Sequence, residues 1–175
     1  AYLIRVSGPL RVDVLRESFQ GLVNRHDALR ASFAADGSGQ TISGHQQVEL
    51  QTTSLAGLSD DGEKGRRLDE CVRAATRSVF DLAAGPLFRF SLFDLGDQRW
   101  AVLMVIHHLV ADGWSWGVLL EELGELYTAK VEGRAVPDRP ALQYRDYVAW
   151  TESPLQQARA ASAEASWLEL LADRR

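Results

Sequence analysis

The most constraining stretch of the sequence is residues 101–117, AVLMVIHHLVADGWSWG, in which an apolar run ends abruptly at two histidines. The run from Ala101 to Ile106 is too short to span a membrane and is typical of a buried strand. Asp112-Gly113 breaks the strand, and leucines then recur at helical spacing. The pattern predicts a core strand, a loop and a helix, with both imidazoles at the strand end, where rigid scaffolds often present reactive groups.

The two histidines suit proton transfer, because a free imidazole titrates near neutral pH. Side chains alternate along a strand, so we expect His107 and His108 to point to opposite faces, and only one of them to face a given cavity. This alternation argues against one metal ion bound by both rings. Asp112 is expected to need a partner, and Gly113 suits a turn with positive φ or the close approach of a ligand.

The same residues also fit a purely structural interpretation. In that interpretation His107 and His108 are core histidines beside a turn, and Asp112 caps the following helix. A bare pair of histidines favours it, whereas the full pattern His-His-x-x-x-Asp-Gly directly after a strand favours a reactive site.

The composition fits one globular domain with a sizeable core. The 175 residues are 46% hydrophobic and 25% charged, and the formal net charge of -5 gives no support for nucleic-acid binding. The sequence shows no signal peptide or membrane span. Cys71 is the only cysteine, so no intramolecular disulfide is possible, and we expect a reducing, cytoplasmic compartment.

Upstream of the histidines, hydrophobic periodicity predicts a strand over 2–6 and a helix over 12–24. A turn at 36–39 separates two short strands, and a period-two pattern continues over 48–52.

A second helix and an antiparallel hairpin are predicted next. Asp60 followed by Glu63 is typical of a capping box, which opens the helix. A turn at 94–97 joins a strand over 87–93 to the central strand. The apolar face of the helix consists of Leu68, Val72, Ala75 and Val79.

Downstream, a polar loop over 131–140 is expected to precede two more helices. Residues 144–150 predict a short helix, and Ser153-Pro154 marks the start of another, which reaches Leu171. Trp150 is expected to be a structural packing residue.

Three motifs, in order along the chain, resemble those of one enzyme family. Residues 107–115, HHLVADGWS, resemble the central motif of condensation domains of nonribosomal peptide synthetases. Residues 25–33, RHDALRASF, resemble the family's Arg-His-Glu-x-Leu-Arg-x-x-Phe, and residues 144–150, YRDYVAW, resemble its Tyr-x-Asp-Phe-Ala-x-Trp. The family shares its fold with chloramphenicol acetyltransferase. The resemblance therefore implies an α/β half-domain, a two-layer sandwich of a mixed, largely antiparallel sheet with helices packed on it.

The resemblance covers only part of the family's two-lobed domain. The opening Ser-x-Ala-Gln motif would precede Ala1, and the Phe-Val-Asn-Thr motif of the C-terminal lobe is absent from the sequence. We therefore expect residues 1–175 to form the N-terminal lobe, to pair with a C-terminal lobe, and to be inactive alone.

The resemblance implies amide-bond formation between two substrates carried on the phosphopantetheine arms of peptidyl or acyl carrier proteins. The acceptor amine attacks the donor thioester, and His108 is the implied catalytic residue, acting as a base or by positioning. The chain itself is expected to bind no cofactor or metal, and no nucleic acid or membrane. The implied supporting residues are His107, Asp112, Gly113, Arg25, Arg30 and Trp150.

Asp112 and Arg30 are both expected to be structural. Asp112 is expected to form an ion pair with an arginine, for which Arg30 is one candidate and an arginine of the C-terminal lobe is another.

Three alternatives to a condensation domain stay open. An epimerisation domain shares the central motif but deprotonates an α-carbon, and Arg25 argues against it because epimerisation domains more often carry histidine there. A stand-alone acyltransferase that forms esters or amides is the second alternative. The third is a non-catalytic lobe that only docks a carrier protein or another lobe.

Overall fold

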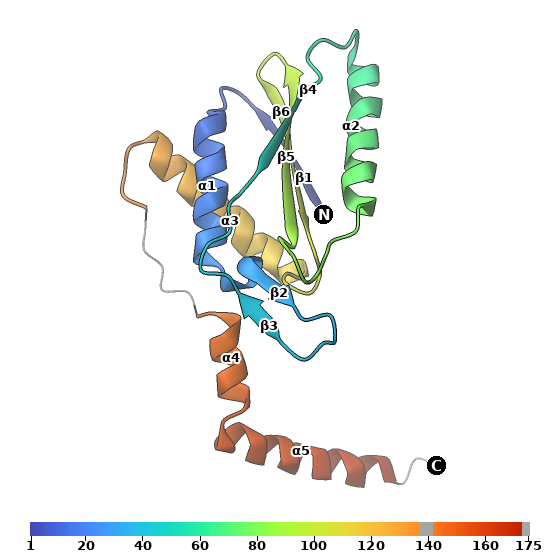
Figure 1. The fold of residues 1–175 in the computed structure, drawn as a ribbon, viewed down its shortest axis with the longest axis vertical. Coiled ribbons are helices and arrows are strands. Elements are labelled where there is room, and N and C mark those ends of the chain that lie inside the picture. The colour runs from blue at the N-terminus through green and yellow to red at the C-terminus, as the bar shows by residue number, and fades with distance from the viewer. Residues whose placement is uncertain (137–141, 173–175) are drawn as a thin grey trace. The chain divides into compact units, whose positions relative to one another are not determined.

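Strands and helices are interspersed along the chain as far as α3, and two further helices follow (Figure 1). A computed structural model describes residues 1–136 and 142–172 and divides into two units, Ala1–Arg139 and Pro140–Arg175. The elements in chain order are β1 (Tyr2–Ser7), α1 (Val12–Arg25), the 3-10 helix η1 (Asp27–Arg30), β2 (Ala31–Phe33), β3 (Gln40–Ile42), β4 (Leu50–Ser54), α2 (Asp61–Arg77), β5 (Phe88–Gly96), β6 (Arg99–Ile106), α3 (Gly113–Val131), α4 (Tyr144–Thr151) and α5 (Pro154–Ala172).

A four-stranded sheet in the order β1-β6-β5-β4 forms the centre of the first unit (Figure 1). β6 pairs antiparallel with both β1 and β5, whereas β4 pairs parallel with β5. β2 and β3 form a separate antiparallel pair. The mixed, largely antiparallel sheet with helices packed on it confirms the predicted fold class.

The two central strands, β5 and β6, contribute side chains to apolar clusters on both faces of the sheet. Phe90, Val102 and Met104 belong to the cluster that α1 and α3 cover. Phe93 and Leu103 belong to the other cluster, which α2 covers. Because successive side chains of a strand point to opposite faces, even and odd positions separate in this way. The helices thus cover both faces, and α2 adds a third layer to the expected two-layer sandwich (Figure 1).

The hairpin between β5 and β6 is confirmed, but it turns later than the sequence suggests. β5 continues to Gly96, with a register shift between Asp94 and Gly96, and the turn residues are Asp97 and Gln98. Both turn residues have positive φ, 53° and 55°, as in a type I′ turn. The predicted turn at 94–97 is displaced because Leu95 is buried in the core, which keeps this part of the chain in the sheet.

α2 differs from the sequence prediction at both ends. Asp60 caps the helix by accepting a hydrogen bond from the Glu63 N–H at 2.8 Å, but the Glu63 carboxylate accepts from Ser59. The predicted capping box is therefore only half formed. The helix ends at Arg77, so Val79 lies beyond it and is 88% exposed, rather than on its apolar face.

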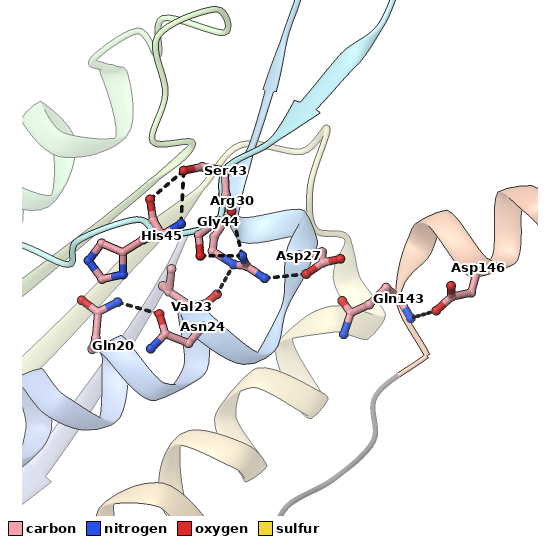
Figure 2. Close-up of polar contacts among 10 residues, drawn as sticks. All are labelled: Gln20, Val23, Asn24, Asp27, Arg30, Ser43, Gly44, His45, Gln143 and Asp146. Carbon is pink, nitrogen blue, oxygen red and sulfur yellow. Dashed lines mark hydrogen bonds and ion pairs between the residues drawn. The ribbon is translucent and has the colours of Figure 1, made fainter.

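The second unit contains α4 and α5, which confirm the two helices predicted after residue 143. Neither helix has a buried residue among those described in this unit. Asp146 accepts a hydrogen bond from the Gln143 N–H at 2.8 Å and so helps to cap α4 (Figure 2). Of the loop predicted over 131–140, Val131 is the last residue of α3, and residues 137–141 lie outside the described residues.

Candidate active site

The two histidines follow directly on the last residue of β6. β6 ends at Ile106, and the His107 N–H still donates to the Leu87 carbonyl oxygen at 2.9 Å, as the next rung of the ladder between β5 and β6. The Val110 N–H donates to the His107 carbonyl oxygen at 3.1 Å and closes a turn over 107–110. The predicted location of the histidines at the end of a buried strand is confirmed. We call the segment 107–110 the histidine turn.

The rings of the two histidines lie in different surroundings. His107 is partly buried, and its Nδ1 accepts a hydrogen bond from the Leu109 N–H at 3.1 Å. Its ring also meets the ring of Phe80 edge-on, with centroids 5.9 Å apart and planes at 85°. His108, in contrast, is exposed. The first imidazole is therefore held by the protein, and the second is accessible to a ligand.

Both histidines line one open pocket of about 480 Å³ beside the C-terminal end of α2. We call it the histidine pocket, and its wall also includes Arg77, Ser78 and Phe80. The expectation that only one histidine can face a given cavity is wrong here. The reason is that His108 lies in the histidine turn, where the alternation of a strand no longer applies.

Asp112 is an exposed residue that caps α3. Its Oδ1 accepts hydrogen bonds from the Ser115 N–H at 2.9 Å and the Ser115 hydroxyl at 2.7 Å. The Ser115 hydroxyl oxygen accepts in turn from the Asp112 N–H at 3.0 Å, which completes a capping box. The Ser115 hydroxyl, followed by the backbone donors, holds the pKa of Asp112 below its ordinary value. This cap fixes the start of α3 just after the histidine turn.

Gly113 is the first residue of α3, and its φ is not positive. The expectation of a turn that needs positive φ is therefore wrong at this position. A Cβ added to Gly113 would meet no atom within 4 Å among those described. The sequence suggests two reasons for a glycine here, a positive φ and the close approach of a ligand. The local geometry permits only the second.

Arg30 pairs with Asp27 and not with Asp112. Its guanidinium donates to the Asp27 carboxylate and to the carbonyl oxygens of Val23 and Ser43, at 3.2 and 2.7 Å for the two carbonyls (Figure 2). Arg30 is therefore wrong as the candidate partner of Asp112, because Arg30 pairs with Asp27 within η1 and Asp112 binds Ser115 in the first turn of α3. A pair between Asp112 and an arginine of a C-terminal lobe stays a prediction. The contacts of Arg30 join the end of α1, η1 and the chain after β3.

Arg25 and His26 of the first motif meet Glu122 of α3 in a largely buried ion-pair cluster. Glu122 Oε2 lies 2.8 Å from Arg25 Nη1 and 3.1 Å from His26 Nε2, and its side chain is only 7% exposed. Burial raises the pKa of Glu122, but the hydrogen bonds and charges of Arg25 and His26 outweigh it, so the pKa lies below its ordinary value. The cluster connects the first motif to the helix that follows the histidine turn.

Sequence reasoning names Arg25 but misses both of its neighbours in this cluster. The signal that could have found Glu122 is its position on α3. It lies three residues after Leu119 and four before Leu126, on the helix face that enters the core. A carboxylate among core leucines needs a charged partner, so this spacing predicts an ion pair.

Trp150 belongs to the second unit, where three aromatic residues follow one another along α4. The ring centroids of Tyr144 and Tyr147 are 5.9 Å apart, and those of Tyr147 and Trp150 are 5.7 Å apart. The structural role of Trp150 stays a prediction.

Within residues 1–136 and 142–172, no group of three His, Cys, Asp or Glu side chains is placed to hold a metal ion. In the same ranges, no helix is both long enough and apolar enough to cross a membrane.

The family model of the condensation domain matches residues 1–175, the whole chain. The chain therefore belongs to the condensation domain family, which confirms the resemblance of its three motifs. It is similar to surfactin synthase subunit 1 of Bacillus subtilis (strain 168), with 39% identity over 145 residues, 83% of this chain and 4% of that protein. It is also similar to cyclosporin synthetase simA of Tolypocladium inflatum, with 34% identity over 175 residues, 98% of this chain and 1% of that protein.

Solved structures show the same fold. The protein SgcC5 from Streptomyces globisporus has a TM-score of 0.77 and 27% identity, over 97% of this chain and 40% of that one. The starter condensation domain of rhizomide synthetase RzmA has a TM-score of 0.81 and 21% identity, over 98% of this chain and 41% of that one. The chain thus spans a few per cent of its curated relatives and about two fifths of these solved chains.

Proposed function

We propose that this chain is the N-terminal lobe of a condensation domain of a nonribosomal peptide synthetase and carries the catalytic histidine for amide-bond formation. The observation that carries the proposal is the placement of His108. It is exposed in the histidine pocket, on a turn held between a buried strand and a capped helix. That arrangement occurs in a chain whose whole length matches the condensation domain family.

In the proposed reaction, the amine of a carrier-bound acceptor attacks the thioester carbon of a carrier-bound donor. A C–N bond forms, the C–S bond breaks, the thiol of the donor's phosphopantetheine arm leaves, and the nitrogen loses one proton. An α-amino group titrates near pH ~8, so part of the acceptor is neutral without a strong base. His108 takes this proton or orients the amine, and the open space beside Gly113 lets a substrate approach the turn.

The proposal includes two kinds of partner. Peptidyl or acyl carrier proteins would bring both substrates on phosphopantetheine arms, so the chain itself needs no bound cofactor. A C-terminal lobe would cover the histidine pocket, in agreement with the larger size of the solved chains, of which this chain matches 40% and 41%. We call this chain joined to that lobe the complete domain.

The isolated chain is expected to form no amide product above the rate without enzyme. Its pocket is open, so water enters freely and the substrate arms are held on one side only. The test mixes the purified chain with donor-loaded and acceptor-loaded carriers, with and without the C-terminal lobe, and follows product by mass spectrometry. Product formed by the chain alone, at the rate of the complete domain, would contradict the proposed division into lobes.

A further inference from the structure

Arg89 lies outside the three motifs, yet it holds one wall of the histidine pocket. It comes from β5, and its Nη1 and Nη2 donate to the carbonyl oxygens of Ser78 and Val79 at 2.9 and 2.7 Å. These carbonyls lie directly after the end of α2, where no further turn of the helix supplies N–H donors to them. Ser78 and Val79 both line the pocket, so Arg89 fixes the path of this wall.

Phe80 lies between Arg89 and the first histidine. The guanidinium carbon of Arg89 is 3.7 Å from the centroid of the Phe80 ring, which is a close cation–π contact. The same ring meets His107 edge-on, with centroids 5.9 Å apart. The Phe80 ring is therefore held by a cation and in turn limits how the imidazole of His107 can rotate.

His107 transmits this orientation to the turn that carries His108. Its Nδ1 accepts from the Leu109 N–H at 3.1 Å, which places the proton of the neutral ring on Nε2. A rotated His107 ring would lose this hydrogen bond, and the Leu109 N–H follows His108 directly in the turn. The direction of the His108 side chain thus depends on the orientation of the ring before it.

We propose that Phe80 and Arg89 are positioning residues, which act through His107 to present His108 to the substrates. The inference rests on the proposed function, in which His108 is the catalytic residue. A guanidinium is needed at position 89 because its planar fork reaches two carbonyl oxygens while its face covers an aromatic ring. Lysine carries the same charge but cannot make all three contacts.

The first arm of the test is an NMR measurement on the chain labelled with ¹⁵N-histidine and ¹⁵N-leucine. The chain has 4 histidines, so their ring signals can be assigned by single replacements. Phe80→Leu and Arg89→Lys are expected to shift the His107 Nδ1 and Nε2 signals and to speed exchange of the Leu109 N–H. Arg99→Lys is the matched control, because Arg99 pairs with Asp61 at the opposite end of β6. Unchanged His107 and Leu109 signals in both variants would overturn the proposal.

The second arm is amide-bond formation by the complete domain. Phe80→Leu is expected to lower kcat by about 10- to 100-fold with little change in KM, because a catalytic group displaced by about 1 Å loses that much. Phe80→Tyr keeps the aromatic ring, so its kcat is expected to lie close to that of the unchanged domain. If Phe80 only filled space with apolar atoms, Phe80→Leu would be tolerated as well as Phe80→Tyr. Equal kcat values for Phe80→Leu and Arg99→Lys would also overturn the proposal.

The two arms separate this inference from the proposed function. If Phe80→Leu shifts the His107 signals while His108→Ala retains full turnover, the proposed function is wrong. Phe80 and Arg89 then orient His107 but do not position a catalytic residue. If His108→Ala is inactive while Phe80→Leu leaves the His107 signals unchanged, the function stands and the inference fails.

Discussion

Replacing His108 with alanine in the complete domain is expected to lower kcat for amide-bond formation by about 10²- to 10⁴-fold, the usual contribution of a general acid or base. The fold should not change, because the His108 ring has no hydrogen-bond, ion-pair or ring partner among the described residues. Initial rates with loaded carriers measure the effect, and circular dichroism and the melting temperature check the fold.

His45→Ala is the matched control, because His45 is also exposed and lies on the chain after β3, outside the residues that line the histidine pocket. It should leave kcat unchanged. Full turnover by His108→Ala would show that another group carries the chemistry.

Replacing Glu122 with alanine is expected to lower the free energy of unfolding by about 3 kcal/mol, a large share of the stability of a small domain. The change removes a carboxylate that is 7% exposed and that binds both Arg25 and His26, so both side chains lose their partner in the core. Urea denaturation of the purified chain measures the loss. Glu121→Ala on the same helix, where the side chain is exposed, should cost far less.

The Glu122 cluster also predicts how stability depends on pH. Because the pKa of Glu122 is lower in the folded chain than its ordinary value, its contribution is fully present above the pKa of the unfolded chain, about 4.3. The contribution is lost as the pH falls through the lower pKa of the folded state. Glu122→Gln should therefore flatten the fall in stability below about pH 5. If stability fell equally steeply with pH in Glu122→Gln, other carboxylates would account for the acid sensitivity of the fold.

The local spacing of apolar residues predicts most elements of the first unit, because a buried strand or helix face repeats apolar residues at its own period. The apolar run before His107 and the leucines of α3 are examples, and both elements are found where they are expected. The turn of the β5–β6 hairpin is displaced, because burial of Leu95 is a tertiary effect. The parallel pairing of β4 with β5 joins distant segments, and no local period encodes it.

The pairing of site residues is predicted less well than their location. Sequence reasoning offers Arg30 as one candidate partner for Asp112, although the two lie far apart in the chain, whereas both residues use partners three positions away. A contact between residues within one helical turn costs little loop-closure entropy. Asp27 is therefore the favoured partner for Arg30, and Ser115 for Asp112. Glu122 is missed because it is absent from every motif, although its place among the leucines of α3 requires a charged partner.

The most direct test of the central claim is the mass of the carrier-bound products when the complete domain acts in D₂O. Loaded donor and acceptor carriers are mixed with it, and each carrier is weighed by intact-protein mass spectrometry. Our account predicts that the acceptor carrier gains the mass of the donor acyl group and that the donor carrier loses it. An acceptor that keeps its mass, while a carrier-bound aminoacyl or peptidyl group takes up one deuterium at its α-carbon, would contradict the account and indicate an epimerisation domain.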